Sequence, residues 1–530
     1  MRKKVKFAEL RFYFVVLFIF CFMTIVYVNA AVKNYGMEGD EVFSYISSTS
    51  FGGYKGICFL DDQTWYEGTY FRDALIAEGE ECFNYKMVVE NQAMDTHPPF
   101  YYLLLNLVAS VFSGQFSRWF GIGLNIFLML FVWTGLYLIL NRFLHRRYLA
   151  AFFSTVFCCS YLTFSLVLFI RMYILLMAIA LFQTWYHLRL YEEVRKNRNF
   201  SFRYHWKSYV FLTVLTICGA WTHYYFIIYQ CLISILFCVA LLYRKQFVDI
   251  LRYIGCMVLS ASIYILIYPA ALNHLFFKYR GREAVHKILE GNSLQGEAGE
   301  MLRSYNRDLY HGMLLWIAGG LLAVTVILLI RKKLRPTSIG KGILMLMPVG
   351  IYFLIISKAS PFISLRYIAP VAPIIFAAVV VWAIRLIEVT KLKRREKQLV
   401  GGLMCLIFVF VCTYWWQRPI KYSFYAEKRD VIIELSELSD FCVYVTGDEY
   451  NWKMWEDYIY YPLFKGLYFI DGREMKPIED LRMTAMENAV IFIDSALDQE
   501  EILDYLSKYL SCKHYEMVYS AQYNNIYFAT

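Results

Sequence analysis

The chain has 530 residues, of which 59% are apolar, 19% are aromatic and 18% are charged. This composition excludes a simple soluble protein and indicates a polytopic membrane protein, with room for about ten spans of roughly 20 residues and a further soluble domain. The net charge of +10 is unevenly divided, because residues 418–530 carry 11 Lys and Arg against 20 Asp and Glu, a net charge of −9, while the rest carries +19. We therefore expect two environments along the chain and no nucleic acid partner.

The first apolar run, FYFVVLFIFCFMTIVYVNAAV at residues 12–32, follows a basic head with Arg2, Lys3, Lys4 and Lys6. A cleaved signal peptide is the alternative interpretation, but the run is longer than the 7 to 15 apolar residues of a signal core. We therefore interpret it as an uncleaved anchor whose basic end lies in the cytoplasm.

Later apolar runs fall at about residues 98–113, 119–141, 148–169, 172–191, 208–222, 224–243, 253–272, 311–330, 341–357, 367–388 and 398–416. The basic junctions between these runs are NRFLHRR, RKNRNFSFRYHWK, RKKLR and KLKRREK. If every run crossed the membrane, these junctions would all lie outside, against the cytoplasmic preference of Lys and Arg. One run must not cross. Residues 98–113 are the best candidate, because the run is short and begins with Pro98 and Pro99.

The resulting prediction is an α-helical polytopic membrane protein with about eleven transmembrane helices, a cytoplasmic N-terminus and an outer C-terminus. A first outer loop with juxtamembrane helices, residues 33–118, is acidic: residues 33–96 carry 12 Asp and Glu against 4 Lys and Arg. A second outer loop at about 273–310 contains FFKYRGREAVHK and is predicted to be a mixed, partly helical lid.

The composition changes after Trp416, where short apolar strands such as FCVYVTG, GLYFID and NAVIFID alternate with amphipathic stretches. This pattern predicts a small α/β domain, so we divide the chain into a transmembrane domain, 1–416, and an extracytoplasmic α/β domain, 417–530. In the stretch SALDQEEILDYLSKYL, Ser495 followed by Asp498 is a variant of the capping box and predicts a helix start.

The 13 cysteines form no Cys-x-x-Cys pair and offer no metal-ligand spacing. Most lie in apolar runs, where a thiol is a small hydrophobic group. Two pairs in outer segments, Cys58 with Cys82 and Cys442 with Cys512, are candidates for disulfides in an oxidising compartment.

The predicted topology brings a set of polar residues to the outer side of the membrane: Asp40, Glu41, His97, Arg171, Tyr173, His223, Tyr224, Lys358 and Arg366. Each has an ordinary alternative, since His and Tyr at span ends form interfacial belts, Arg and Lys snorkel, and acidic residues solvate loops. As a set they are more informative, because they combine a candidate base with several cations at one surface.

These residues lie in motifs that resemble a known family, the polytopic GT-C glycosyltransferases, and within it the bacterial relatives of protein O-mannosyltransferases and of the lipid A aminoarabinose transferase (the glycosyltransferase family 39-like group). The matching stretches are GDEVFSYIS, THPPFYYLLLNL, IRMYILL, THYYF and KASPFISLRYIAPVAP, which together cover roughly residues 35–375. Each stretch alone is a weak signal, but five in order, all on the predicted outer side, are fairly specific.

The resemblance implies an enzyme that transfers a sugar from a polyprenyl phosphate to an acceptor hydroxyl with inversion at the anomeric carbon. In the family an Asp of the first outer loop is the base, which matches Asp40; a carboxylate within reach of a hydroxyl can take its proton as the new bond forms. Glu41 is then the neighbour that positions the loop or the acceptor. The donor sugar lipid, membrane lipid and a protein, lipid or glycan acceptor are the expected partners.

The leaving phosphate gains charge as the glycosidic bond breaks, so the reaction needs fixed cations near it. Arg171, Lys358 and Arg366 are the candidates, and Arg adds bidentate geometry. His97, Tyr173, His223 and Tyr224 complete the predicted phosphate-binding set. The aminoarabinose transferases carry Lys where this chain has His97, whereas the mannosyltransferases carry His.

A secondary transporter or lipid flippase is the rival hypothesis. Transporters place ionisable residues or broken helices near the bilayer midplane and often have paired halves, and the predicted spans show neither feature. A non-catalytic envelope protein would not need the acidic pair together with the cations. Some GT-C enzymes use a divalent metal held by several carboxylates; here a single acidic pair stands out, so we expect a reaction without a metal or other cofactor.

Overall fold

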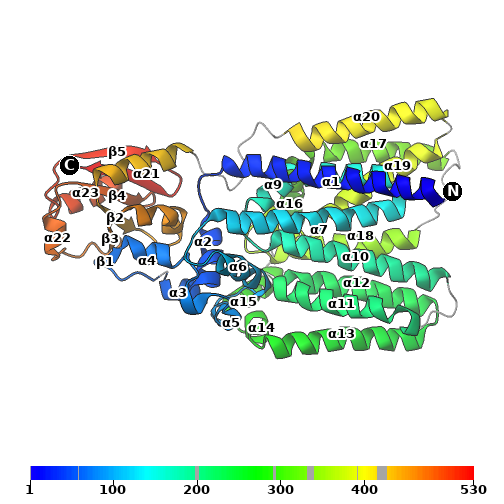
Figure 1. The fold of residues 1–530 in the computed structure, drawn as a ribbon, viewed down its shortest axis with the longest axis horizontal. Helices are drawn as coiled ribbons and strands as arrows, with labels where there is room; N and C mark the ends of the chain where they lie inside the picture. The colour runs from blue at the N-terminus through cyan, green and yellow to red at the C-terminus, as the bar shows by residue number, and fades with distance from the viewer. Residues whose placement is uncertain are drawn as a thin grey trace.

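The structure is a computed structural model that describes residues 2–57, 59–196, 202–289, 294–330, 339–390, 392–414, 426–449 and 451–530. Long helices run side by side in a bundle, and a small unit with a β-sheet covers one end of it (Figure 1). We call this end, where α1 (Arg2–Val32) finishes, the sheet end, and the other, where α1 begins, the N-terminal end.

Among the described residues, seven helices are long and apolar enough to cross a membrane: α1, α7 (Arg118–Leu144), α12 (Tyr225–Tyr243), α13 (Phe247–Ile267), α18 (Ile339–Ala359), α19 (Ala372–Val389) and α20 (Arg394–Thr413). Two bent pairs bring the number to nine if each pair is one span: α8 (Arg147–Cys158) with α9 (Tyr161–Val167), and α16 (Leu294–Tyr310) with α17 (Leu314–Ile330). The chain is a multi-pass membrane protein.

Two further long helices, α10 (Tyr173–Lys196) and α11 (Phe202–Thr222), run beside these spans (Figure 1) but are less apolar. The reason in α10 is a buried polar network: Gln183 donates to Gln230 at 2.5 Å, and His187 lies 2.7 Å from the Tyr253 hydroxyl. Seven to nine described helices therefore qualify as spans by length and composition, and α10 and α11 bring the number to the predicted eleven only if they also cross the membrane.

Helix α6 (Phe100–Val111) contains 12 residues. At 1.5 Å per residue it is about 18 Å long, too short for a hydrocarbon core of about 30 Å. It packs against α2 (Gly39–Thr49), α5 (Tyr85–Met94) and α7 at the sheet end. The length of α6 agrees with the prediction that residues 98–113 do not cross the membrane, and the location of the segment stays a prediction.

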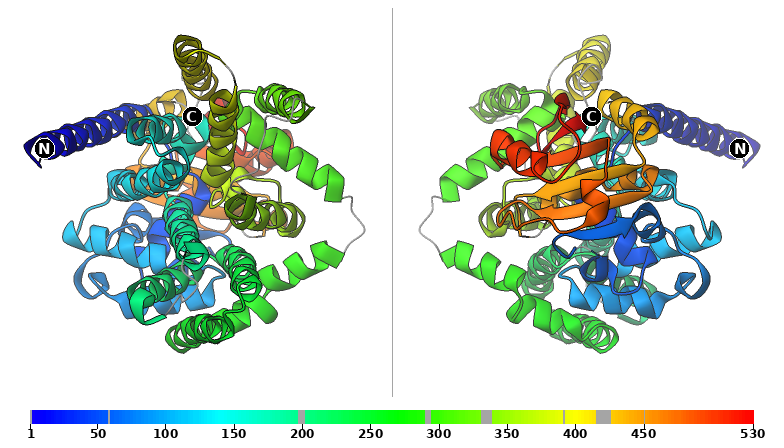
Figure 2. Two further views of the ribbon diagram at one scale, coloured as in Figure 1. Left: turned by 90° about the vertical axis from the view of Figure 1, so that its right-hand side faces the viewer. Right: turned by 90° about the vertical axis from the view of Figure 1, so that its left-hand side faces the viewer.

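The sheet end also carries short elements from the two predicted outer loops. From the first loop these are α2, α3 (Gly53–Ile57), β1 (Thr64–Glu67), α4 (Gly68–Asp73), η1 (Gly79–Glu81), α5 and α6. From the second they are α14 (Ala270–Phe276), α15 (Tyr279–Leu289) and α16. Seen along the bundle, the sheet lies over this end with the first-loop segment beside it (Figure 2).

Six strands of the described chain form one mixed sheet in the order β1-β3-β2-β4-β6-β5. The other elements of the unit are α21 (Ala426–Leu438), β2 (Phe441–Thr446), η4 (Trp452–Glu456), η5 (Tyr458–Leu463), β3 (Gly466–Asp471), α22 (Leu481–Thr484), β4 (Ala489–Asp494), α23 (Gln499–Ser507), β5 (Tyr515–Ser520) and β6 (Asn524–Ala529). Strand β2 pairs in parallel with β3 and β4, and the outer pairs are antiparallel.

The sheet recruits its edge strand from the first loop, because β1 pairs with β3 in antiparallel register, with Trp65 opposite Tyr468. The predicted domain boundary at 416 and 417 lies outside the described residues. Helix α23 begins at Gln499 rather than near Ser495, because Asp498 caps it by accepting from the N–H groups of Glu500 and Glu501.

Side chains alternate along the strands, so the sheet has two apolar faces. Tyr444 and Phe469 belong to a core that continues into the helix bundle, while Val443 and Ile491 belong to a second core under α23. Cys442 faces the first core and Cys512 lies in the second, and both are free thiols, so this predicted disulfide is not formed. The other predicted pair includes Cys58, which lies outside the described residues.

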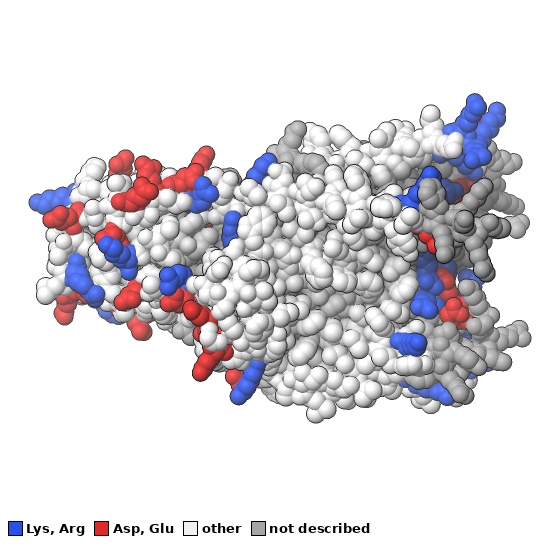
Figure 3. All heavy atoms as spheres, viewed as in Figure 1, with Lys and Arg blue, Asp and Glu red and all other residues white. Residues whose placement is uncertain are grey.

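Charge differs between the two ends of the molecule. Lys and Arg gather at the N-terminal end, and Asp and Glu are frequent on the sheet unit (Figure 3). At the N-terminal end Glu192 binds both Arg142, at 2.7 Å, and Lys341, at 2.5 Å, which ties α10 to α7 and α18.

Candidate active site

A cavity of about 330 Å³ lies at the sheet end, bordered by helix ends and connecting turns. Its lining includes seven of the nine residues predicted for the site: Asp40, His97, Arg171, Tyr173, His223, Tyr224 and Arg366. They come from α2, the α5–α6 turn, the α9–α10 turn, the α11–α12 turn and η2 (Leu365–Ile368). Among the described lining residues, Glu41 and Lys358 are missing.

The start of α2 is fixed by a reciprocal capping box. The Glu38 carboxylate accepts the Asp40 N–H at 2.8 Å, and the Glu41 carboxylate accepts the Glu38 N–H at 2.8 Å. Asp40 thus lies in the first turn of α2, where the helix dipole favours a negative charge.

Glu41 points away from the cavity and is 1% exposed. Its second carboxylate oxygen accepts the Ile170 N–H at 2.9 Å, so one side chain joins the start of α2 to the turn before α10. Burial raises the pKa of Glu41 to about 8, against the lowering effect of the two N–H donors, so the group is mostly protonated at neutral pH.

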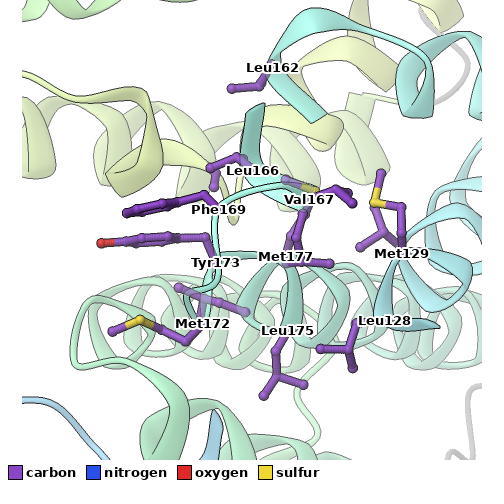
Figure 4. Packing of buried hydrophobic residues seen from close by; sticks show 14 of the residues in the cluster. Leu128, Met129, Leu162, Leu166, Val167, Phe169, Met172, Tyr173, Leu175 and Met177 are labelled. Atoms are coloured by element: carbon purple, nitrogen blue, oxygen red, sulfur yellow. The ribbon is translucent and has the colours of Figure 1, made fainter. Parts of the chain in front are cut away.

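The turn between α9 and α10 presents Arg171 to the cavity. Its neighbours hold it by packing, with the rings of Phe169 and Tyr173 stacked at a centroid distance of 6.1 Å (Figure 4). Val167 and Met177 fill the space behind the turn (Figure 4). Arg171 is therefore fixed on a buried backbone rather than carried on a loose loop.

Arg171 is 3% exposed, and its guanidinium lies among polar atoms of three other elements. It donates to the backbone oxygen of Asp40 at 3.2 Å and to the Tyr102 hydroxyl at 3.0 Å, and one nitrogen lies 3.6 Å from the Asp40 carboxylate. A further hydrogen bond of 3.2 Å joins it to Nε2 of His97.

Arg366 approaches Asp40 from the opposite side, with Nη1 2.5 Å from Oδ2. Aromatic rings surround its guanidinium, the nearest being Phe362, with a centroid 4.9 Å from Cζ, and Tyr367, at 5.4 Å. Such faces stabilise a cation by their quadrupole while leaving the guanidinium edge available to an anion.

The two guanidinium groups decide the charge of Asp40. Burial alone would raise the pKa of this carboxyl, but the charges of Arg171 and Arg366 outweigh burial and hold the pKa well below its usual range. Asp40 is therefore ionised at neutral pH and, as long as both arginines remain against it, a weak base.

His97 is held by a carboxylate that the sequence reasoning missed. Asp95 Oδ2 lies 2.7 Å from Nδ1 of His97, and because a carboxylate accepts, Nδ1 carries the proton and Nε2 accepts from Arg171. The signal was present in the printed sequence, since Asp95 precedes His97 by two residues in DTHPPF.

His223 is neutral, because burial, helped by the positive charges of Arg171 and Arg366, lowers its pKa to about 3. Its Nδ1 accepts the Tyr225 N–H at 3.1 Å, so the proton resides on Nε2 and is available to a ligand.

Tyr224 donates to Nδ1 of His274 at 2.6 Å. Its hydroxyl is therefore committed to a protein partner, although the side chain lines the cavity.

Lys358 lies in the last turn of α18, 3.6 Å from Glu297 of α16. Its neighbour Ala359, not Lys358 itself, borders the cavity described above.

The fold was compared with solved structures. An ArnT structure from Cupriavidus metallidurans, bound to undecaprenyl phosphate, superimposes over 97% of this chain and 98% of that chain, with a TM-score of 0.52 and 11% identity. The chain has the GT-C fold. An apo ArnT structure matches with the same TM-score, and an oligosaccharyltransferase from Archaeoglobus fulgidus tethered to an acceptor peptide matches at 0.48, with 10% identity over 97% of this chain and 74% of that one. No family model and no curated protein matches the sequence.

The cavity lining combines ionisable groups with apolar side chains. Asp40, His97, Arg171 and Arg366 are ionisable, as is Glu283 of α15, and Ile227, Ile228, Val285 and Ile288 are apolar. A ligand that combines an anion with an apolar chain is compatible with this mixed lining.

Proposed function

We propose that the protein is an inverting glycosyltransferase that moves a sugar from a polyprenyl-phosphate donor to an acceptor hydroxyl on the outer face of the membrane. The observation that carries the proposal is the Asp40 carboxylate held between Arg171 and Arg366 in a partly apolar cavity at the end of a membrane helix bundle. The GT-C fold supports it, and the similar ArnT structure contains undecaprenyl phosphate.

The proposed orientation follows from charge. Lys and Arg at the N-terminal end favour a cytoplasmic location for that end, and the sheet end, with the cavity and the C-terminal unit, is then outside. Donor lipid in the outer leaflet reaches the cavity from the membrane, and the acceptor arrives from water.

Arg171 and Arg366 bind the donor phosphate in this proposal, with His97, His223 and Tyr173 around it. The phosphate of the donor gains negative charge as the bond to the anomeric carbon breaks, and two fixed guanidinium groups in a poorly hydrated cavity stabilise that charge. Lys358 acts at longer range, because its partner is Glu297.

Donor binding also prepares the base. Arg171 and Arg366 depress the pKa of Asp40 while they are paired with it, and a phosphate that competes for them weakens that effect. Asp40 then accepts the proton of the acceptor hydroxyl as its oxygen attacks the anomeric carbon. Transfer in a single displacement inverts the configuration at that carbon and forms no covalent sugar on the protein.

Glu41 has a positioning role in this proposal, since its carboxyl accepts the N–H groups of Glu38 and Ile170 and so joins the start of α2 to the turn before α10. The reaction is proposed to need no metal, because two guanidinium groups, those of Arg171 and Arg366, already lie against the Asp40 carboxylate.

The proposed sugar is a hexose or pentose, and His97 favours a mannosyl-type hexose over aminoarabinose. The acceptor is a hydroxyl on a protein, lipid or envelope glycan, and the sheet unit lies where it can meet that acceptor. The rival hypothesis, a transporter or flippase of glycan precursors, predicts transport without a new glycosidic bond.

Mass spectrometry of lipid-linked sugars and envelope glycans, in cells with and without the protein, tests the proposal. Loss of one glycan together with accumulation of its lipid-linked donor supports it. Unchanged glycans with a changed distribution of precursor across the membrane would favour the transporter.

A further inference from the structure

The turn that carries His97 is tied down by groups from a distant segment. Nζ of Lys278 donates to three successive backbone oxygens, those of Ala93, Met94 and Asp95, at 2.9, 2.9 and 2.6 Å. An ammonium group with three carbonyl partners has satisfied all its donors. Lys278 thus fixes the end of α5, more than 180 residues away in sequence.

A second contact supports the same turn. His274, four residues before Lys278, has Nε2 3.0 Å from the Ala93 oxygen and accepts the Tyr224 hydroxyl on Nδ1 at 2.6 Å. Burial and Lys278 lower the pKa of His274, against the raising effect of the Ala93 oxygen, which is consistent with a neutral ring that donates from Nε2. The α11–α12 turn and α14 therefore converge on the backbone before His97.

From this fixed turn a chain of contacts leads to the cavity. The Asp95 side chain, 16% exposed, holds Nδ1 of His97 at 2.7 Å, and Nε2 of His97 accepts from Arg171 at 3.2 Å. Rotation of the His97 ring would break both bonds. The orientation of the Arg171 guanidinium on this side therefore depends on the Asp95 carboxylate.

We propose that Asp95 and Lys278 are positioning residues of the donor-phosphate site, which act through the His97 ring on Arg171. The inference rests on the proposed function, because it assumes that Arg171 meets a phosphate. Asp95 itself does not border the cavity among the described residues, so its effect on a ligand is indirect. Lys278 holds the backbone from which Asp95 projects.

A double-mutant cycle separates this indirect action from a direct one. When two residues act through one contact, the free-energy effects of their substitutions are not additive. The probe is undecaprenyl phosphate, and its binding to the purified full chain in detergent is measured by native mass spectrometry. Binding is compared for the unaltered protein, Asp95→Asn, His97→Ala and the double variant. Asp73→Asn is the matched control, because Asp73 is an exposed acid whose ion pair is with its neighbour Arg72.

We expect His97→Ala and Asp95→Asn each to weaken binding by about tenfold, as for loss of a charge-assisted hydrogen bond, and the double variant to bind no more weakly than His97→Ala. Lys278→Met should weaken binding less, and should have no further effect when combined with His97→Ala. The variant Asp73→Asn should bind like the unaltered protein.

Multiplicative losses in the double variant, or undiminished binding by both Asp95→Asn and Lys278→Met, would overturn the inference while leaving the proposed donor in place. If Asp95→Asn does not fold, Lys278→Met, alone and combined with His97→Ala, decides between the same outcomes. Failure of the unaltered protein to bind undecaprenyl phosphate would overturn the proposed donor and the inference with it.

Discussion

Arg366 and Asp40 are 326 positions apart in the sequence, and their side chains form an ion pair of 2.5 Å inside the cavity. The pair joins the turn after α18 to the first turn of α2. In the proposed mechanism the Asp40 carboxylate and the donor phosphate compete for this one guanidinium, because Arg366 is one of the two arginines proposed to bind the donor.

The first prediction concerns Arg366. Arg366→Ala should weaken binding of undecaprenyl phosphate by roughly ten- to hundredfold, because a charge-assisted contact contributes about 1.5 to 3 kcal/mol. Arg366→Lys should restore little of it if the two-pronged geometry of guanidinium matters. Equilibrium binding measures both, with Arg482→Ala as the control, since Arg482 stacks on Trp65 in the sheet unit. Full affinity in Arg366→Ala would exclude the residue from the phosphate site.

The second prediction concerns pH and Glu41. Its pKa of about 8 in the folded protein exceeds the ordinary value of 4.5, so the unfolded chain releases this proton first. The contribution of Glu41 to stability is thus fully present below pH 4.5 and declines as pH rises toward 8. Raising the pH from 5 to 8 should therefore destabilise the unaltered protein more than it destabilises Glu41→Gln. Thermal unfolding at each pH measures the difference. Equal pH dependence of the two would contradict the proposed burial of a protonated Glu41.

The third prediction concerns orientation. A cysteine introduced at Ser507, exposed on α23, should react with an impermeant thiol reagent applied to intact cells. One at Arg244, exposed at the N-terminal end, should react only after permeabilisation. Native cysteines are accounted for by labelling the unaltered protein in parallel. Labelling of the Arg244 variant from outside would reverse the proposed topology.

The fourth prediction is that a metal chelator leaves transfer unchanged. The two charges beside Asp40 are already supplied by Arg171 and Arg366, so a divalent ion would be repelled from this position. Transfer measured with and without EDTA tests this. Loss of activity that Mg²⁺ or Mn²⁺ restores would show that the proposed mechanism lacks a component.

The membrane architecture could be predicted from sequence because it depends on local properties. Apolar runs and basic junctions are sufficient to locate spans, and the alternating stretches FCVYVTG, GLYFID and NAVIFID coincide with β2, β3 and β4. The pairing of β1 with β3 was missed, because it joins residues about 400 positions apart and is selected by packing.

Part of the candidate site could also be predicted from local properties of the sequence. Seven residues reach one cavity because each lies at a helix end or in a connecting turn at the sheet end of the bundle. Glu41 was grouped with Asp40, but its side chain points about 100° away around α2 and is bound there by the N–H groups of Glu38 and Ile170. Lys278 was missed because its contacts join distant segments. Asp95 lies only two residues before its partner His97, so the sequence contained the signal and it was overlooked.

The most direct test of the central claim is the rate of sugar transfer by Asp40→Asn, measured under conditions in which donor binding is shown to be saturated. The amide keeps the size of the side chain but cannot accept a proton at neutral pH. We expect donor binding to persist, transfer to fall by on the order of a hundredfold or more, and Glu41→Gln to cost less. Near-normal transfer by Asp40→Asn, or a product that retains the anomeric configuration of the donor, would contradict the assignment of Asp40 as the base of an inverting transfer.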